Sequence, residues 1–328
     1  MRAKIELRQL QANVRWFQSK TIDLISLPEL SIRLATYLWS SGQHIHPEPV
    51  SQYLPTDLAT LQRFLDFYLP FHIAVDFPNV PKSSIRRLAI GSAHLHLYGA
   101  LLDYILDASF QSAAKLEVIT PYLLFQAQRI LANLFPIDSI FWKKLDLLLT
   151  QTSWTLLSEQ PKPSSKIEAC SLSQYRRSAH KKMALAKTNV IGLAILNGTP
   201  DRISALNVCW NALMFLATLD DDVIDWVEDY QEGKYTFLLT QILLSEPFRA
   251  DVDSGRMPNI DEVGAALFCS DTIERLYLEA AENLQQAELA ISQFNCPAIT
   301  NLLRVHRDKT LLRANTIVAN KIGALISM

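Results

Sequence analysis

The chain has 328 residues, of which 49% are hydrophobic and 20% charged, and its formal net charge is −2. This length is enough to bury one large core or two modest ones, and the nearly neutral charge gives no reason to expect a nucleic-acid partner. The cysteines Cys170, Cys209, Cys269 and Cys296 are far apart and form no CxxC pair. We therefore expect neither a zinc site nor a disulfide framework, and we interpret the chain as a cytoplasmic protein with reduced thiols.

The N-terminus gives no signal for secretion. Residues 1–8 lack an uninterrupted apolar stretch. No run in the chain reaches the ~18 consecutive apolar residues that span a bilayer, so we expect no transmembrane segment. From Arg8 to Lys20, basic residues alternate with large apolar ones, which leaves a peripheral membrane contact open. A surface helix packed on the protein's own core is the favoured interpretation.

The spacing of apolar residues predicts an all-α protein. Glycine is scarce, with 9 in the chain, and apolar residues recur mostly at i, i+3 and i+4. In chain order, helices are expected over residues 22–42, 58–68, 84–110, 121–133, 138–160, 173–196, 202–231, 235–244, 260–294 and 297–328. The clearest connector is 160–173, which is rich in proline and serine. We expect N-terminal helices in 1–83 to pack on a helical bundle formed by 84–328, both within one structural domain.

An acidic segment follows the most apolar helix of the chain. Its acids are Asp220, Asp221, Asp222, Asp225, Glu228 and Asp229. Since residues 207–219 are almost wholly apolar, these acids continue a buried helix. At ~3.6 residues per turn, Asp221, Asp225 and Asp229 form one row, with Asp222 and Glu228 beside it.

Carboxylates gathered in one place repel each other unless cations neutralise them. Mg²⁺ takes one or two protein carboxylates and completes its coordination with water and phosphate oxygens. The row therefore predicts a site for metal ions and a diphosphate. The alternative is an acidic, solvated helix face.

A second pair of acids lies earlier in the chain. Asp103 and Asp107 are one turn apart on an otherwise apolar helix. Alone, this pair is typical of an ordinary helix surface. Together with the acidic segment it predicts two helices that face each other across a bundle, each holding Mg²⁺ from its own side of a diphosphate.

Basic residues that could bind this diphosphate gather near the middle of the chain. A charged leaving group needs cationic donors, and the cluster comprises Arg176, Arg177, His180, Lys181, Lys182 and Lys187. We favour Arg177, His180, Lys181 and Lys187 as substrate-binding residues, because the helix turns apolar after them. Lys234 is a further candidate, since Gly233 before it lets the backbone approach phosphate closely. A weaker cluster contains His306, Arg307, Lys309 and Arg313.

These motifs resemble those of class I isoprenoid synthases. The likeness comprises the two-aspartate helix, the helix reading Asp221-Asp222-x-x-Asp225-x-x-Glu228-Asp229 and the trailing Gly233-Lys234-x-Thr236. It covers roughly 84–328 and is nearest the squalene-synthase-like and bacterial large-terpene branch. The first motif lacks the paired aspartates of ordinary prenyltransferases. The second is not the Asn-Ser-Glu triad of bacterial terpene cyclases.

The resemblance implies an all-α bundle around a central apolar cavity, with a polyprenyl diphosphate as substrate. It also implies Mg²⁺ ions between the two motifs, three in the family, with Mn²⁺ as a substitute. The metal ligands implied are Asp103, Asp107, Asp221, Asp222, Asp225 and Asp229. Of these, Asp103, Asp107, Asp221 and Asp225 would carry the catalytic ionisation.

The favoured function is a class I terpene synthase, which ionises an allylic polyprenyl diphosphate and cyclises or rearranges the cation. The runner-up is a prenyltransferase that elongates a chain or condenses two chains, a reading supported by Gly233-Lys234. A non-catalytic protein that binds a prenyl lipid or an enzyme partner belongs to another class, and the presence of both acid motifs argues against it. A helical di-metal oxygenase would need Glu-x-x-His pairs, which the chain lacks. Substrate length and oligomeric state stay open.

Overall fold

The computed structural model describes residues 65–107, 110–159 and 167–327, and no strand occurs in this part of the chain. The predicted all-α class is therefore confirmed. The helix expected at 22–42, most of the one at 58–68 and the basic, apolar segment from Arg8 to Lys20 lie outside the described residues. The expected division into 1–83 and 84–328 stays a prediction for the same reason.

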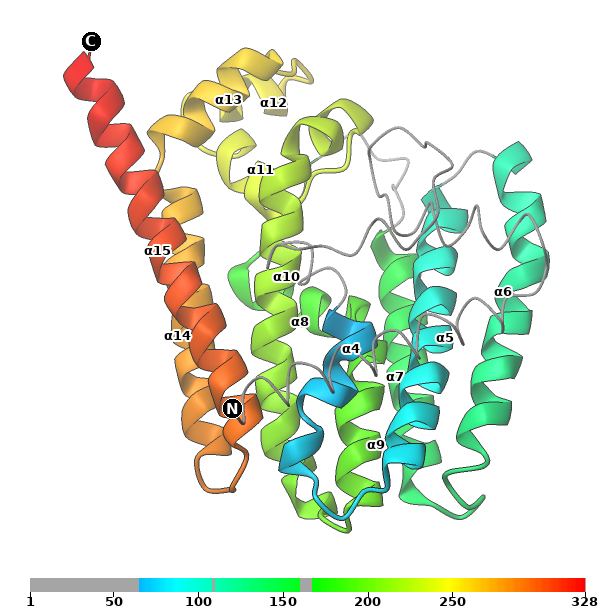
Figure 1. Cartoon of the computed structure of the whole chain (residues 1–328). Helices are drawn as coiled ribbons and strands as arrows, with labels where there is room; N and C mark the ends of the chain where they lie inside the picture. The colour runs from blue at the N-terminus through cyan, green and yellow to red at the C-terminus, as the bar shows by residue number, and fades with distance from the viewer. Residues whose placement is uncertain (1–64, 108–109, 160–166, 328) are drawn as a thin grey trace, which may run out of the picture.

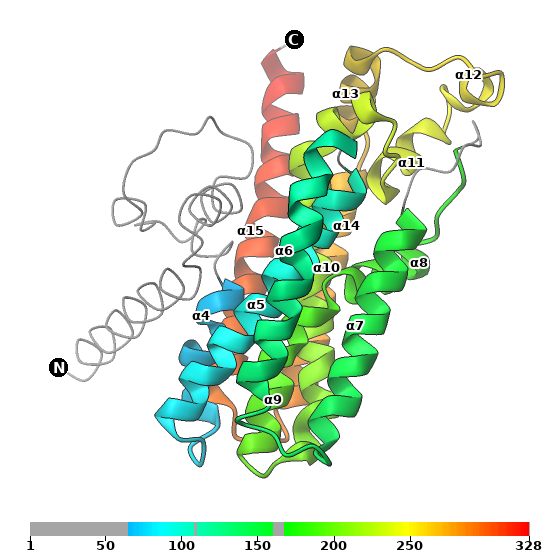
Figure 2. The ribbon, with the colours of Figure 1, turned by 90° about the vertical axis from the view of Figure 1, so that its right-hand side faces the viewer.

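The described helices form an elongated bundle (Figure 1). They are α4 Leu65–His72, α5 Lys82–Asp107, α6 Phe110–Leu131, α7 Ile140–Glu159, α8 Leu172–Lys182, α9 Thr188–Leu196, α10 Ile203–Glu232, α11 Phe237–Leu243, α12 Arg249–Asp253, α13 Ile260–Cys269, α14 Thr272–Ile291 and α15 Pro297–Ser327. Short 3₁₀ turns, η2 Ala74–Asp76, η3 Ala184–Lys187 and η4 Pro200–Arg202, join some of them. Figure 2 shows the long helices side by side, with α11, α12 and α13 at one end.

Several helix boundaries differ from the prediction. The helix expected over 260–294 is divided at Ser270 and Asp271 into α13 and α14. The Ser270 hydroxyl accepts a hydrogen bond from the Thr272 amide (3.4 Å), the first amide of α14, which has no partner within the helix. Helix α6 begins at Phe110 and runs through Pro121, where a start was predicted, and the expected loop 246–259 contains α12.

The most consequential difference lies in the predicted helix 173–196. The chain leaves the α-helix at Met183, makes the tighter turn η3 and resumes as α9. All four residues of η3 are buried. The small side chains Ala184 and Ala186 let this turn pack closely between α5, α7 and α10, so tertiary packing overrides helix propensity here.

Helix α10 forms the centre of the core. It packs against α8, α9, α11, α14 and α15, and it contributes Trp210 and Phe215, both fully buried. Full burial of an aromatic side chain of this size stabilises the fold by about 2–3 kcal/mol. By length and composition, one stretch of the described residues, 200–232, could cross a membrane, but 61% of its apolar window is buried inside the bundle. Core packing accounts for this hydrophobicity.

The segment α8–η3–α9 places α5 and α10 relative to each other. Its η3 and α9 pack against both helices. The approach of α9 to α5 is so close that a Cβ at Gly192 would lie 2.6 Å from Leu88 Cδ1. A side chain at this position would require the buried Leu88 side chain to shift.

A buried carboxylate ties the beginning of the described chain to the last helix. Asp76 Oδ1 accepts a hydrogen bond from the Ala298 amide (3.0 Å), and Oδ2 accepts one from the Ile299 amide (2.8 Å). These amides belong to the first turn of α15, whose N–H groups have no partner within the helix. Asp76 therefore caps α15 from a distant part of the sequence.

We expect Asp76→Ala to lower the free energy of unfolding by about 1–3 kcal/mol, because it leaves two buried amides without an acceptor. Asp76→Asn keeps one acceptor oxygen and should cost less. Urea unfolding followed by circular dichroism measures both. Equal stability of wild type and Asp76→Ala would show that the cap contributes nothing.

Candidate active site

The two acid-bearing segments lie at the same end of the bundle. Asp103 is in the last turns of α5, and the acidic segment forms the last third of α10 (Figure 1). Asp107 is the final residue of α5, and only its backbone is described. The two motifs thus share one end of the bundle, and their placement on opposite sides of a metal-bound diphosphate stays a prediction.

The acids of α10 differ in their surroundings. Asp221 and Asp225 are exposed, and Asp229 is half-buried. Asp222 is 9% exposed, and its Oδ2 has no hydrogen-bond partner among the described residues. Burial, together with the charges of Asp221 and Asp229, raises the pKa of Asp222 to about 7. A buried carboxylate with an unused oxygen is suited to receive a cation.

The Tyr175 side chain of α8 lies beside Asp222. Tyr175 stacks on Phe237, with ring centroids 4.8 Å apart, and meets Phe215 edge to face at 5.6 Å. Its hydroxyl lies beside Asp222 and lowers the pKa of that carboxyl. Yet neither this hydroxyl nor Asp222 Oδ2 has a partner of normal hydrogen-bond geometry in the described structure. Burial raises the pKa of Tyr175, so the phenol stays protonated.

The end of α10 brings Lys234 back to the acids. Gly233 adopts a left-handed conformation (φ 72°) that few other residues adopt, and it ends the helix. The Lys234 amide then donates to the Asp229 carbonyl (2.8 Å), while Lys234 Nζ lies 3.0 Å from Glu232 Oε2. Burial raises the pKa of Asp229 to about 6, and the charge of Lys234 opposes this rise.

The predicted basic residues separate into buried and exposed groups. Lys187, in η3, is 6% exposed and donates from Nζ to the His180 carbonyl (3.4 Å). Burial lowers its pKa to about 8. Burial, with Lys187 and Arg176 nearby, lowers the pKa of His180 to about 4, so this imidazole is neutral at pH 7. Arg177 and Lys181 are exposed on α8.

Lys182 is a site residue that the sequence did not single out from its cluster. Its Nζ lies 3.7 Å from Asp103 Oδ2, which joins α8 to α5. Its charge also lowers the pKa of Asp222 and of Asp229 on α10. The sequence predicted one continuous helix through residue 196. It could not identify Lys182 as a partner of Asp103, because that prediction missed the end of α8 at Met183.

The weaker C-terminal cluster has a different role. Arg313, on α15, forms an ion pair with Asp220 and lies over the ring of Tyr277 at 5.3 Å. Asp220 is therefore engaged by α15 rather than by the row of Asp221 and its neighbours. His306 is buried, and burial lowers its pKa to about 4.

The residues present fit Mg²⁺ in a substrate-completed site. Among the described residues, no group of three or more His, Cys, Asp or Glu side chains is placed to hold a metal ion by itself. Mg²⁺ does not need such a group, since one or two carboxylates, water and phosphate oxygens satisfy it. The unpartnered Oδ2 of Asp222 and the exposed carboxylates of Asp221 and Asp225 offer oxygen ligands of this kind.

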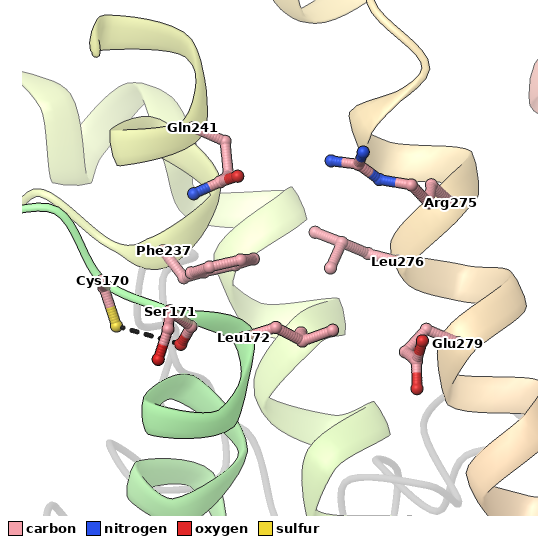
Figure 3. Close-up of a pocket in the computed structure, with 8 residues that line it drawn as sticks. All are labelled: Cys170, Ser171, Leu172, Phe237, Gln241, Arg275, Leu276 and Glu279. Atoms are coloured by element: carbon pink, nitrogen blue, oxygen red, sulfur yellow. Dashed lines mark hydrogen bonds between the residues drawn. The ribbon is translucent and has the colours of Figure 1, made fainter. Parts of the chain in front are cut away.

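A cavity of about 330 Å³ lies behind the aromatic pair, between the start of α8, α11 and α14. Its lining residues are Cys170, Ser171, Leu172, Phe237, Gln241, Arg275, Leu276 and Glu279 (Figure 3). Phe237 belongs both to this wall and to the stack on Tyr175. The central apolar cavity implied by the sequence resemblance is a different feature and stays a prediction.

Solved structures of known proteins share this architecture. A polyprenyl synthase from Caulobacter crescentus, complexed with calcium and isoprenyl diphosphate, matches with a TM-score of 0.71 and 16% identity, over 93% of this chain and 96% of its own. A decaprenyl diphosphate synthase from Rhodobacter capsulatus matches with a TM-score of 0.71 and 15% identity, over 95% and 99%. A geranylgeranyl pyrophosphate synthase from Corynebacterium glutamicum gives 0.67 and 14%, over 94% and 93%.

The chain has the class I isoprenoid synthase fold. No protein-family model matches it, and no curated protein matches it by sequence. This fold is the one expected from the resemblance of the acid motifs. The three structures named above are prenyl diphosphate synthases, whereas the sequence resemblance was nearest the squalene-synthase-like and large-terpene branch.

Because the pKa of Asp222 is raised in the folded protein, the free energy of unfolding should depend on pH. This pKa rises from 3.8 to about 7, so the native state binds this proton more tightly than the unfolded chain. The contribution of protonated Asp222 to stability is present at low pH and is lost as the pH rises from about 4 to about 7. Relative to wild type without metal, Asp222→Asn should gain up to about 4 kcal/mol across this interval.

Urea unfolding of both proteins at a series of pH values measures this difference. Comparison with Asp222→Asn is essential, because the lowered pKa values of His180 and His306 act in the opposite direction in wild type. A difference in stability that does not change with pH would contradict the assignment of Asp222 as a proton-binding carboxyl.

Proposed function

We propose that the protein is a metal-dependent isoprenoid diphosphate synthase that transfers a prenyl group from an allylic polyprenyl diphosphate to a second isoprenoid diphosphate. The observation that carries this proposal is the buried carboxylate of Asp222, whose Oδ2 has no hydrogen-bond partner among the described residues. It lies among further acids, and Lys182, which pairs with Asp103, is near enough to lower its pKa. The fold supports it, since structures with the same architecture are polyprenyl and geranylgeranyl diphosphate synthases. One of them is complexed with calcium and isoprenyl diphosphate.

In this reaction the bond between the allylic carbon and the diphosphate oxygen breaks, and the diphosphate keeps the electron pair. Bound Mg²⁺ would neutralise the oxygens of the leaving group. Asp103, Asp221, Asp222, Asp225 and Asp229 are the carboxylates proposed to hold the metal, with Asp107 completing the first motif. The double bond of the second substrate then captures the allylic cation, and a proton is lost from the product.

Basic side chains are proposed to receive the departing diphosphate. Lys187 is a buried residue of η3, and Lys234 follows the end of the acidic helix. An ammonium in a partly dry site interacts strongly with phosphate oxygens. Neutral His180 would act as a hydrogen-bond donor, while the exposed Arg177 and Lys181 would attract the substrate from solution.

Terpene cyclisation is the second candidate, and one feature of the chain favours it. Tyr104 stands where ordinary prenyltransferases have the second aspartate of their first motif. A cyclase would ionise the same substrate at the same acids, but the cation would be captured by a double bond of its own chain. The two functions therefore differ in whether a second substrate is consumed.

We expect Asp221→Asn and Asp225→Asn to lower the rate of diphosphate release by about 10²–10³-fold, because each removes a charge that positions the metal. Both side chains are exposed, so folding should be unaffected. Asp146→Asn, an exposed carboxylate on α7, is the matched control and should keep full activity. Release is measured from farnesyl and geranylgeranyl diphosphate, with and without Mg²⁺ and isopentenyl diphosphate.

Product analysis separates the candidates. Longer diphosphates that form only with isopentenyl diphosphate support prenyl transfer, whereas hydrocarbons that form without it support cyclisation. Absence of release from every substrate, together with absence of Mg²⁺ binding, would reject both and leave a protein that binds prenyl lipids or an enzyme partner.

A further inference from the structure

The ammonium of Lys182 connects the two acid-bearing helices. Its Nζ lies 3.7 Å from Asp103 Oδ2 on α5, and the two side chains are 35% and 38% exposed. A single pair of this exposure contributes little to stability. Its position is the important feature, because α8 also packs against α10 and carries Tyr175, whose hydroxyl lies beside Asp222.

The end of α8 is held in place by its neighbours. Lys182 is the last residue of this helix, and the Thr152 hydroxyl of α7 donates to the carbonyl of Lys181 (3.3 Å). A cation at a helix C-terminus is favoured by the helix dipole. The following turn, η3, is entirely buried and leaves α8 little freedom to shift. Movement of Lys182 is therefore confined to its side chain, which has four rotatable carbon–carbon bonds.

Mg²⁺ and the Lys182 ammonium need the same carboxylate. Asp103 is the one acid of the first motif whose side chain is described, and Lys182 pairs with its Oδ2. A divalent ion placed there would also be repelled by the ammonium. Phosphate oxygens, in contrast, are attractive partners for both cations. The Lys182 side chain can therefore oppose the binding of Mg²⁺ in the absence of diphosphate and favour the binding of Mg²⁺ together with diphosphate.

We propose that Lys182 is an internal counter-ion of the acid cluster, which competes with Mg²⁺ for Asp103 and passes to the diphosphate when metal and diphosphate bind together. This role rests on the proposed function and assigns a residue to the order in which metal and substrate bind. Mg²⁺ alone binds weakly, and the diphosphate brings the metal into the site.

Lys182→Gln tests this role, because glutamine keeps much of the side-chain length and removes the charge. Calorimetry should show that Mg²⁺ alone binds the variant about five- to tenfold more tightly than wild type, since a competing charge is gone. Inorganic diphosphate in the presence of Mg²⁺ should bind the variant about tenfold more weakly, since a cationic donor is lost. Effects of opposite sign are specific to a shared counter-ion.

Two control variants keep the result interpretable. Lys182→Arg retains the charge and should resemble wild type in Mg²⁺ affinity. Lys143→Gln removes an exposed charge on α7, away from the acids, and should change neither affinity. Thermal unfolding of each variant shows whether it is folded, and a Lys182→Gln protein that fails to fold leaves Lys182→Met to be measured in the same way.

Each outcome decides one part of the proposal. Unchanged or weaker binding of Mg²⁺ alone by Lys182→Gln, with wild-type binding intact, overturns the counter-ion role and leaves the proposed function standing. Absence of Mg²⁺ and diphosphate binding by wild type overturns the proposed function and the counter-ion role with it. Tighter metal and weaker diphosphate binding by the variant supports both.

Discussion

Repulsion among carboxylates at the end of α10 is the constraint on which the rest of the structure depends. Asp221, Asp222, Asp225 and Asp229 continue a helix whose preceding turns are buried in the core. The helix cannot move away from its own packing, so the acids must be neutralised where they are. The protein does this partly by protonation, since the pKa of Asp222 is about 7, and partly by cations. A diphosphate with divalent metal would complete the neutralisation.

The same constraint explains the irregular segment beside α10. An unbroken helix through 173–196 would continue in one direction past the acids. Because the chain turns at Met183, Lys182 faces Asp103 while Lys187 enters the interior. Lys182 and Lys187, five residues apart, thus have distinct surroundings. Lys182 is partly exposed and lies near carboxylates, whereas Lys187 is buried and has a pKa of about 8. The break in the helix produces this division of roles.

Neighbouring helices connect α10 to more distant parts of the molecule. Arg313 of α15 neutralises Asp220 and so separates this carboxylate from the row that faces α5. On the other side, Tyr175 and Phe237 form a stacked wall between Asp222 and the cavity bordered by α8, α11 and α14. Helices α8, α14 and α15 therefore pack against α10 and fix its orientation from several directions.

The sequence by itself determined the helical class and the acid motifs, because apolar periodicity and carboxylate spacing are local properties of the chain. It also placed Asp221, Asp225 and Asp229 on one row. Only the tertiary structure decided which acid is buried and which lysine reaches the first motif. These depend on contacts between helices far apart in sequence, and on the turn at Met183, where packing of small residues outweighs helix propensity.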